Sequence, residues 1–506
     1  MNVWFIPISM KISLATKGVC VFVRSLRSAH FFYFQGVLFI MKKNTGLVNG
    51  LEDFSGNCTA VGISDSAKME RNDCALAGAS CFVFADGIIS GLTDDGQRLS
   101  AIVIPCEIDG QKVENIGKEA FVENDKLTNV KIENGVATIG DRAFAWCSSL
   151  ANILLPDSLT NIGSRAFARC SALKNVEIPS SVTDIGIRAF SRCSRLTGID
   201  IPNGVTSIGD SAFGGCDNLM TVKIPSSVTT IGENAFATKK SFALSVRSVY
   251  ITDLKAWCKI SFKGAYANPL YPIGKLYLNN ALVKELVIPE GVEHITDYAF
   301  SGCSSLTSVT IPSEVVSIGN RAFANCNSLT SVNIPNGVVS IGDRAFANCS
   351  RLASLTIGNT VSNIGEYAFY SCFYLTSVVI PDSVITIGDS AFSDCNYLTS
   401  VAIGNGVKRI GNWAFYACSY LTSLTIGSSV TSIGLQAFYA CSSLTSIIIP
   451  KSVKNIEKDA FNECKSLTYI TFNGTKAEWN KIGKIWSWNS GVPATKVICT
   501  DGEVAL

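Results

Sequence analysis

Histidine and charged residues are scarce in this chain of 506 residues, which has only His30 and His294 and 16% charged side chains. The usual charged share is about a quarter. Two histidines cannot supply a mixed cysteine and histidine zinc cluster, and a histidine-based catalytic triad would need an unusual setting for one of them. Basic and acidic residues nearly cancel, 42 against 40, so the basic excess required for nucleic-acid binding is absent.

Catalytic motifs are missing as well. The chain has no Gly-rich phosphate loop, no HExxH, no CxxC and no GxSxG. Its acidic residues mostly stand where a capping role explains them. We therefore expect no enzyme activity, no cofactor, no metal and no nucleic-acid partner. With 47% hydrophobic residues, the chain is too apolar to be disordered as a whole.

What the sequence does contain is a repeat. The string Ile-Gly-x-x-Ala-Phe returns every 23 residues in two blocks, with Thr296 and Glu457 replacing the glycine in two copies. Repetition at a fixed period is typical of stacked architectures. The leading isoleucines are Ile116, Ile139, Ile162, Ile185, Ile208 and Ile231 in the first block and Ile295, Ile318, Ile341, Ile364, Ile387, Ile410, Ile433 and Ile456 in the second.

One repeat unit has two halves with different periods. Residues 331–335 alternate between polar and apolar and end in proline, and Asn336 and Gly337 follow, so we predict a short strand and a turn. From Ile341 onward the apolar residues share one helical face, and Asp343 is placed to cap a short helix. Each unit is therefore predicted to be a strand, a turn and a short helical segment.

A single unit of this length cannot bury its own apolar face, whereas stacked units can. The predicted fold class is an α/β repeat solenoid, a leucine-rich-repeat curved rod with parallel strands on one face and a 23-residue period. The period lies within the leucine-rich-repeat range. A β-helix is the main structural alternative, and the patterned helical half and the one clear strand in each unit disfavour it.

The stretch LTSVTIPSEVVSIGNRAFANC, residues 306–326, resembles the BspA-type (Treponema-type) leucine-rich repeat. The resemblance extends over roughly residues 97–472. It implies a non-catalytic adhesion protein that binds proteins or glycans, including host matrix or another cell, at an extracellular or cell-surface location. An intracellular scaffold, located in the cytoplasm, is the alternative, since the sequence shows no clear signal peptide and has many thiols.

Breaks in the repeat predict six parts. A short apolar run at 31–41 is too short for a confident membrane span. Residues 250–260 and 470–482 both pass from a strand-like triplet to Lys-Ala, a tryptophan and Lys-Ile, so we interpret them as related elements that close or splice the stack. The parts are an irregular region at 1–80 that is either disordered or precedes the true start, an N-terminal cap at 81–115, a first block at 116–236, an aromatic-rich insertion at 237–282, a second block at 283–472 and a C-terminal cap at 473–506.

Most of the 19 cysteines share one repeat position. Because their spacing follows the packing period, we expect buried free thiols, in preference to disulfides or a metal-binding ladder. They are Cys147, Cys170, Cys193, Cys216, Cys303, Cys326, Cys349, Cys372, Cys395, Cys418, Cys441 and Cys464.

Aromatic residues gather at repeat positions of the second block. Because aromatic side chains with polar tips are enriched at interfaces, we predict a partner-binding surface there, with aromatic stacking along the solenoid flank as the alternative. The candidate residues are Tyr367, Tyr370, Tyr374, Tyr397, Trp413, Tyr416, Tyr420 and Tyr439.

Two further ladders are visible. The outward strand positions of the second block are rich in serine and threonine, from Ser308 and Thr310 onward. Either uncharged residues avoid repulsion between stacked coils there, or they form a concave hydrogen-bonding surface for a protein or glycan. In the first block, a basic ladder could meet anionic groups unless neighbouring acids neutralise it. It consists of Arg142, Arg165, Arg169, Arg188 and Arg192.

Overall fold

A computed structural model describes residues 21–22, 29–34, 37–42, 79–238 and 246–506. The chain forms two compact units, residues 1–71 and 72–506. In the first unit, β2 (Ala29–Phe34) pairs antiparallel with β1 (Val21–Phe22) and β3 (Val37–Lys42). The expectation of disorder or a later start for the rest of this region concerns residues outside the described ones.

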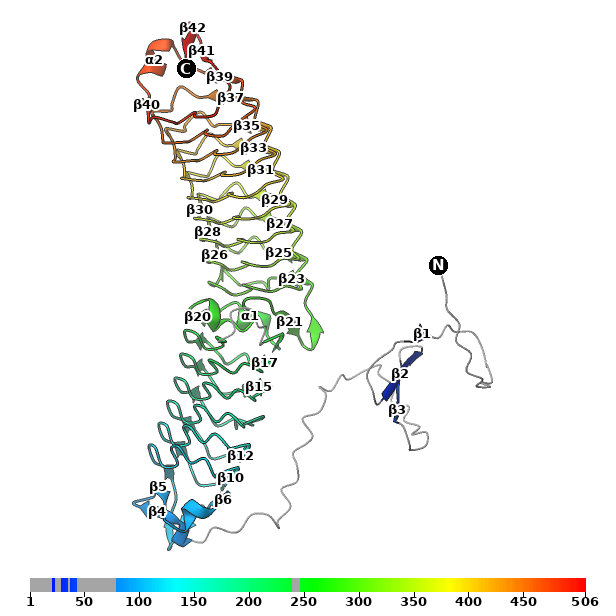
Figure 1. The fold of residues 1–506 in the computed structure, drawn as a ribbon, viewed down its shortest axis with the longest axis vertical. Coiled ribbons are helices and arrows are strands. Elements are labelled where there is room, and N and C mark those ends of the chain that lie inside the picture. Colours follow the sequence, from blue (N-terminus) through cyan, green and yellow to red (C-terminus); the bar gives the residue numbers. More distant parts are fainter. Residues whose placement is uncertain (1–20, 23–28, 35–36, 43–78, 239–245) are drawn as a thin grey trace, which may run out of the picture. The chain divides into compact units, whose positions relative to one another are not determined.

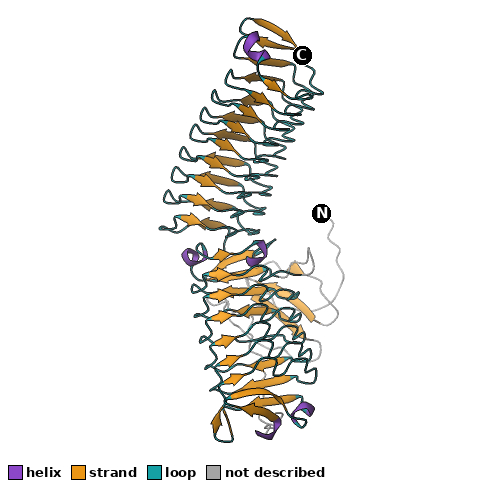
Figure 2. Cartoon of the chain, turned by 90° about the vertical axis from the view of Figure 1, so that its left-hand side faces the viewer, coloured by secondary structure: helices purple, strands orange, loops and turns teal. Residues whose placement is uncertain are grey.

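The second unit is a solenoid of stacked coils in which most coils contribute two parallel strands, one long and one short (Figures 1 and 2). In one coil these are β27 (Ser331–Ile334) and β28 (Ser340–Ile341). Partners in adjacent coils stand one repeat apart, as when Val332 pairs with Leu355. Figure 1 shows the two series on opposite sides of the second block. The predicted parallel-strand repeat solenoid with a 23-residue period is confirmed.

The long strands form several short sheets, and the short strands belong to two nine-stranded sheets, the first of which also includes two strands from before the first block. The long strands are β6 (Ala101–Ile104), β10 (Asn129–Ile132), β12 (Asn152–Leu154), β15 (Gly198–Asp200), β17 (Thr221–Ile224), β19 (Ser248–Ile251), β21 (Lys275–Leu278), β23 (Glu285–Val287), β25 (Ser308–Thr310), β27, β29 (Ser354–Ile357), β31 (Ser377–Ile380), β33 (Ser400–Ile403), β35 (Ser423–Thr425), β37 (Ser446–Ile449), β39 (Tyr469–Phe472) and β41 (Lys496–Cys499). The short strands are β9 (Asn115–Ile116), β11 (Thr138–Ile139), β13 (Asn161–Ile162), β14 (Asp184–Ile185), β16 (Ser207–Ile208), β18 (Thr230–Ile231), β20 (Ser261–Phe262), β24 (His294–Ile295), β26 (Ser317–Ile318), β28, β30 (Asn363–Ile364), β32 (Thr386–Ile387), β34 (Arg409–Ile410), β36 (Ser432–Ile433), β38 (Asn455–Ile456) and β40 (Gly483–Lys484).

The half of each coil that was predicted to be helical is not a helix, and this part of the prediction is wrong. The backbone N–H of Arg344 donates to Glu366 O at 2.8 Å in the next coil, and that of Phe346 donates to Ala368 O at 2.8 Å. An α-helix would use these groups within the coil. Arg344 and Asn348 adopt left-handed φ values of 55° and 59°, which produce two linked tight turns. With two strands and no helix, a coil takes on the character of the β-helix alternative.

The aspartates predicted to cap helices bind the neighbouring coil. Asp343 Oδ1 accepts a hydrogen bond from the backbone N–H of Glu366 at 2.8 Å, and Asp141 Oδ1 accepts one from Ser164 at 2.7 Å. The capping chemistry was therefore assigned to the correct residue type, but the N–H that it satisfies belongs to the stack and not to a helix.

Phenylalanine and cysteine columns fill the core. The rings of Phe346 and Phe369 stack with centroids 5.4 Å apart and are fully buried. Cys349 Sγ donates to the backbone carbonyl of Phe323 in the preceding coil at 3.2 Å, and burial raises the pKa of this thiol to about 12. All twelve cysteines at the repeat position are buried and unbridged, which confirms the prediction of buried free thiols.

The two segments with related sequences form equivalent elements. Each passes from a long strand through a one-turn helix to a short strand, and each helix buries a tryptophan, Trp257 or Trp479. Asp253 caps the first helix and Thr475 the second. The helices are α1 (Leu254–Trp257), between β19 and β20, and α2 (Lys476–Asn480), between β39 and β40.

Antiparallel strands terminate three of the parallel sheets. Such a strand turns the chain back at the end of the sheet and becomes a short edge strand, and short edge strands limit pairing with another chain. The terminating strands are β4 (Phe82–Ala85), paired with β5 (Ile88–Leu92), β22 (Ala281–Leu282), paired with β21, and β42 (Gly502–Ala505), paired with β41.

Candidate functional site: a tyrosine surface on the second block

The most exposed part of the predicted aromatic surface is a column of three tyrosines. Tyr374, Tyr397 and Tyr420 each lie two residues after the buried cysteine of their coil. Their rings stack with centroids 5.3 Å apart at both steps and interplanar angles of 4° and 7°. Between 48% and 54% of each residue is exposed. We call these three residues the Tyr374 stack.

A second column follows the core phenylalanines. Tyr416 and Tyr439 stack with centroids 5.1 Å apart and an interplanar angle of 6°. Both are partly exposed. The residue before each tyrosine, Phe415 or Phe438, is a fully buried core phenylalanine. It anchors the backbone from which the tyrosine side chain projects. We call these two residues the Tyr416 stack.

The other three candidates are placed less simply. Tyr370 shares the position of the Tyr416 stack, but buried Ser393 occupies that position in the intervening coil, so no continuous column forms. Tyr370 instead meets the edge of Tyr367 at 5.7 Å, and the Arg344 guanidinium lies 4.3 Å from the Tyr367 ring centroid.

Trp413 is held by a polar contact to the next coil. Its Nε1–H donates to Gln436 Oε1 at 2.7 Å. Both residues adopt left-handed backbone conformations at the same repeat position. The indole is therefore fixed in orientation and partly exposed beside the stacks on the same flank of turns.

Stacking decides what the Tyr374 stack can offer a ligand. Tyr397 has a neighbouring ring against each face, so its exposed atoms are the ring edge and the hydroxyl. Positive ring edges and phenol hydroxyls suit carbonyl oxygens, amides and aliphatic side chains. A sugar that packs flat on an aromatic face would find the faces of the central ring covered.

Phe373 belongs to the same surface and was not predicted. It is 40% exposed and directly precedes Tyr374. Its carbonyl oxygen accepts a hydrogen bond from the backbone N–H of Tyr397 at 3.1 Å, so it marks the step between two coils of the stack. The sequence did contain a signal for this residue, because Phe373 is apolar at a repeat position where the adjacent coils have the polar residues Ser350 and Asn396.

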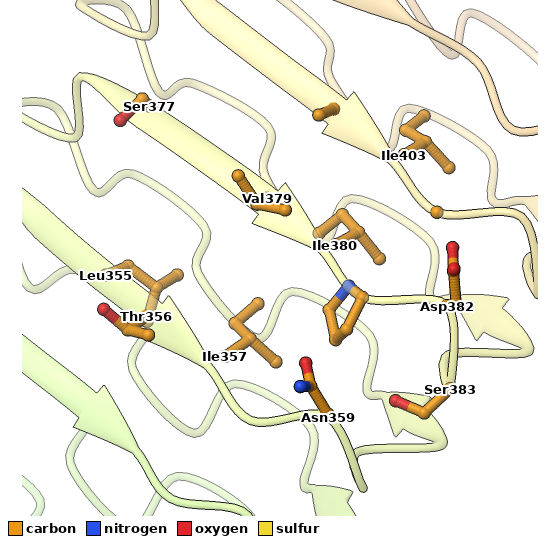
Figure 3. A pocket seen from close by; sticks show the side chains of 13 residues that line it. Leu355, Thr356, Ile357, Asn359, Ser377, Val379, Ile380, Asp382, Ser383 and Ile403 are labelled. Carbon is orange, nitrogen blue, oxygen red and sulfur yellow. The ribbon is translucent and has the colours of Figure 1, made fainter.

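The predicted hydroxyl ladder includes a groove on the long-strand side (Figure 3). This groove, about 680 Å³ in volume, crosses β29, β31 and β33. Val379 is 66% exposed at its centre and pairs in register with Ala402. Figure 3 places Asn359 and Ser383 at the turn end of the groove, which the strand pattern alone did not indicate.

The isolated histidine in the repeats has a structural contact. His294 is exposed in β24, and its Nδ1 lies 2.8 Å from Ser317 Oγ in the next coil. Within the described residues, no group of three or more histidine, cysteine, aspartate or glutamate side chains could hold a metal ion.

A family model described as BspA type leucine-rich repeat region matches residues 114–243, 272–398 and 362–484 in six copies. The chain belongs to this family. The match covers both repeat blocks, in agreement with the resemblance seen in the repeat itself. It supports a protein-binding role for this BspA-type protein, as the repeat solenoid is a binding scaffold.

Solved structures include similar proteins. A leucine-rich repeat protein from Bacteroides ovatus is 27% identical with a TM-score of 0.58, over 83% of this chain and 98% of that chain. A leucine rich cell surface protein from Faecalibacterium prausnitzii A2-165 is 26% identical with a TM-score of 0.40, over 79% of this chain and 95% of that chain. No curated protein matches the chain. Among the described residues, no helix has the length and hydrophobicity needed to cross a membrane.

Proposed function

We propose that this BspA-type protein is a non-catalytic adhesion protein that acts at the cell surface and binds a protein through the Tyr374 stack of its tyrosine surface. The observation that supports this function is the Tyr374 stack, with three half-exposed rings on consecutive coils. Tyrosine loses little conformational entropy on binding and is enriched in protein interfaces. Stacking has already restricted these rings, so the cost of ordering them is lower still.

A protein partner is favoured over a glycan because of the ring geometry. The covered faces of Tyr397 leave edges and hydroxyls, which suit a polypeptide with hydrogen-bonding groups and aliphatic side chains. A cell-surface location is supported by membership of the BspA-type family. A cytoplasmic scaffold of the same fold is the competing proposal.

Substitutions at the two stacks test the binding surface. A triple variant with Tyr374→Ser, Tyr397→Ser and Tyr420→Ser is compatible with the fold, because Ser443 occupies the same position one coil later. Fluorescently labelled full-length protein is applied to a panel of immobilised matrix proteins, such as fibronectin, collagen and laminin. We expect the triple variant to lose at least tenfold in affinity for any matrix protein that the wild type binds, since central aromatic anchors dominate interface energies.

The matched control removes the other stack. Tyr416→Ala and Tyr439→Ala place there the residue that the chain has at Ala324 and Ala347. Equal losses in both variants would contradict the assignment of binding to the Tyr374 stack in particular. Protease treatment of intact producing cells tests the location. Complete protection of the chain in intact cells, with digestion after lysis, would reject the surface proposal in favour of the scaffold.

A further inference from the structure

The turn flank of the first block has arginine at both left-handed positions of two successive coils. Arg165 and Arg169 belong to one coil, and Arg188 and Arg192 to the next, with φ between 57° and 67°. The backbone N–H of Arg192 donates to Gly214 O at 2.8 Å in the following coil. Because bonds between coils fix the backbone at these positions, the side chains project from defined points.

Some arginines of this flank have partners within the chain. Arg142 Nη1 lies 2.8 Å from Glu119 Oε1 and forms an ion pair. The guanidinium of Arg169 lies 3.7 Å from the ring centroid of Trp146 in the preceding coil. A carboxylate and an aromatic face therefore satisfy these two cations.

Arg188 and Arg192 differ from them. Both are exposed, and among the described residues neither has a carboxylate within ion-pair distance or an aromatic ring beneath its guanidinium group. The carboxylate of the neighbouring Asp210 forms no ion pair with either arginine among the described residues, and its Oδ1 accepts the backbone N–H of Glu233 at 2.7 Å. Two cations that line one hollow without an anion repel each other, so an anionic ligand gains from both.

The hollow arises because the repeat changes at the next coil. Ser211 and Gly215 stand there where the preceding coils have arginine, and the resulting cavity of about 260 Å³ is lined by Arg188 and Arg192. A Cβ atom on Gly215 would approach Arg192 Cγ to 3.0 Å, so glycine leaves room for the arginine stem to lie along the coil. The cavity is several times the volume of about 30 Å³ that one water occupies in the liquid.

We propose that this hollow binds the sulfate groups of a sulfated polysaccharide. Two guanidinium groups offer planar, paired N–H donors that match a tetrahedral oxyanion, and arginine suits such groups better than lysine because it is less strongly hydrated. The Ser211 hydroxyl and the Asn234 amide, which also line the hollow, can bond to sugar hydroxyls. The site lies in the first block and does not depend on the tyrosine surface of the second.

The test uses full-length protein titrated with heparin as the probe. The double variant Arg188→Asn and Arg192→Asn removes both cations, and the chain itself accepts asparagine at these repeat positions, as at Asn234 and Asn325. We expect at least tenfold weaker binding at physiological salt. We also expect the slope of log affinity against log salt concentration to decrease by about 2, as each cationic contact contributes about 1.

A matched control loses the same charge from the repeat position of Arg188. Arg321 and Arg344 have left-handed φ values like those of Arg188, but their guanidinium groups lie over Tyr298 and Tyr367. Arg321→Asn with Arg344→Asn should leave the affinity for heparin unchanged. An equal loss in this control would overturn the proposal, because net charge alone would then explain binding.

Two further ligands test whether the hollow recognises sulfate in particular. Fully desulfated heparin keeps its carboxylates, and we expect it not to bind measurably. Binding of desulfated heparin with unchanged affinity would overturn the assignment to sulfate. Binding of polyphosphate in place of heparin would also overturn it, since the hollow would then select phosphate. Loss of matrix adhesion in the tyrosine variants has no bearing on these results, so failure of one proposal is distinguishable from failure of the other.

Discussion

At the scale of single residues, the repeat depends on two left-handed backbone positions in each coil. In the coil that contains Tyr439, these positions are Gln436 and Ala440, with φ of 51° and 57°. A residue with a Cβ atom pays about 1–2 kcal/mol for this conformation. The chain tolerates that cost because bonds between coils require the turn, as when Ala440 N–H donates to Asn462 O at 2.9 Å.

We predict that Ala440→Gly raises the free energy of unfolding by about 0.5–1 kcal/mol. Glycine removes the steric cost of the left-handed conformation, although it adds flexibility to the unfolded chain. Chemical denaturation monitored by circular dichroism measures the difference. Ala437→Gly in the same coil is the control, since Ala437 is fully buried and has no positive φ. That variant should be destabilised, and the same sign of effect in both would contradict the explanation.

Residue identities allowed the core and the stacks to be predicted, but not all of the surface. A spacing of one repeat was sufficient to place Tyr374 on Tyr397, because residues at equivalent positions of adjacent coils must be neighbours. Tyr370 also stands in register with Tyr416 two coils away, but Ser393 occupies the position between them. Phe373 was not identified because it belongs to no column of aromatic residues.

At the scale of secondary-structure elements, apolar residues that are spaced as in a helix belong to a pair of tight turns. Apolar residues near every third and fourth position define one face of a helix, but two linked turns bury the same positions. The deciding factor is the stack, which offers hydrogen-bond partners to Arg344 and Phe346 in the next coil. Hydrophobic periodicity contains no information about which coil supplies the acceptor, so the turns could not be told from a helix by that pattern.

The junction between the blocks depends on one buried amide. Asn268 is fully buried, and its Nδ2 donates to the carbonyl oxygens of Tyr298 and Ala299 at 2.7 and 3.0 Å. Its Oδ1 accepts the backbone N–H of Leu270 at 2.8 Å. Trp257 Nε1 also donates to Ala299 O at 2.9 Å, so the insertion contacts the first coil of the second block through polar bonds.

We predict that Asn268→Ala lowers the free energy of unfolding by about 2–4 kcal/mol. The substitution removes three hydrogen bonds and leaves buried carbonyl and N–H groups without this partner. Denaturant unfolding of the full chain provides the measurement. Asn203→Ala, at an exposed position, is the control and should lie within about 0.5 kcal/mol of the wild type. A similar small effect at Asn268 would show that the junction does not need the amide.

At the scale of the whole molecule, the column of buried thiols couples stability to pH. Burial raises the pKa of Cys216 and of Cys349 to about 12, against an ordinary value of 9.0. The folded chain therefore keeps protons that the unfolded chain releases above about pH 9. Stability is unaffected by these thiols below that pH and falls as the pH rises toward 12, by about 1.4 kcal/mol per pH unit for each thiol.

We predict that removing thiols makes the alkaline loss of stability less steep. A variant with Cys216→Ala and Cys349→Ala should be less stable than the wild type at pH 7, because small cavities remain, but its stability should fall less between pH 9 and pH 12. Denaturation curves across this range give the slope. Cys106→Ala, at an exposed position, should leave it unchanged. Identical slopes in the wild type and the double variant would rule out the thiols as the cause.

The constant register between coils has a consequence for how the length of this protein can change. Throughout the repeat blocks, strand pairs, ring stacks and thiol bonds join a coil only to the coil before or after it. Duplication or deletion of one whole repeat in the gene therefore recreates the same neighbours on both sides of the change. Loss of a single residue would instead break the register between the shortened coil and its neighbours. The length of the solenoid is thus free to vary between related genes by whole coils, while the contacts between neighbouring coils are preserved.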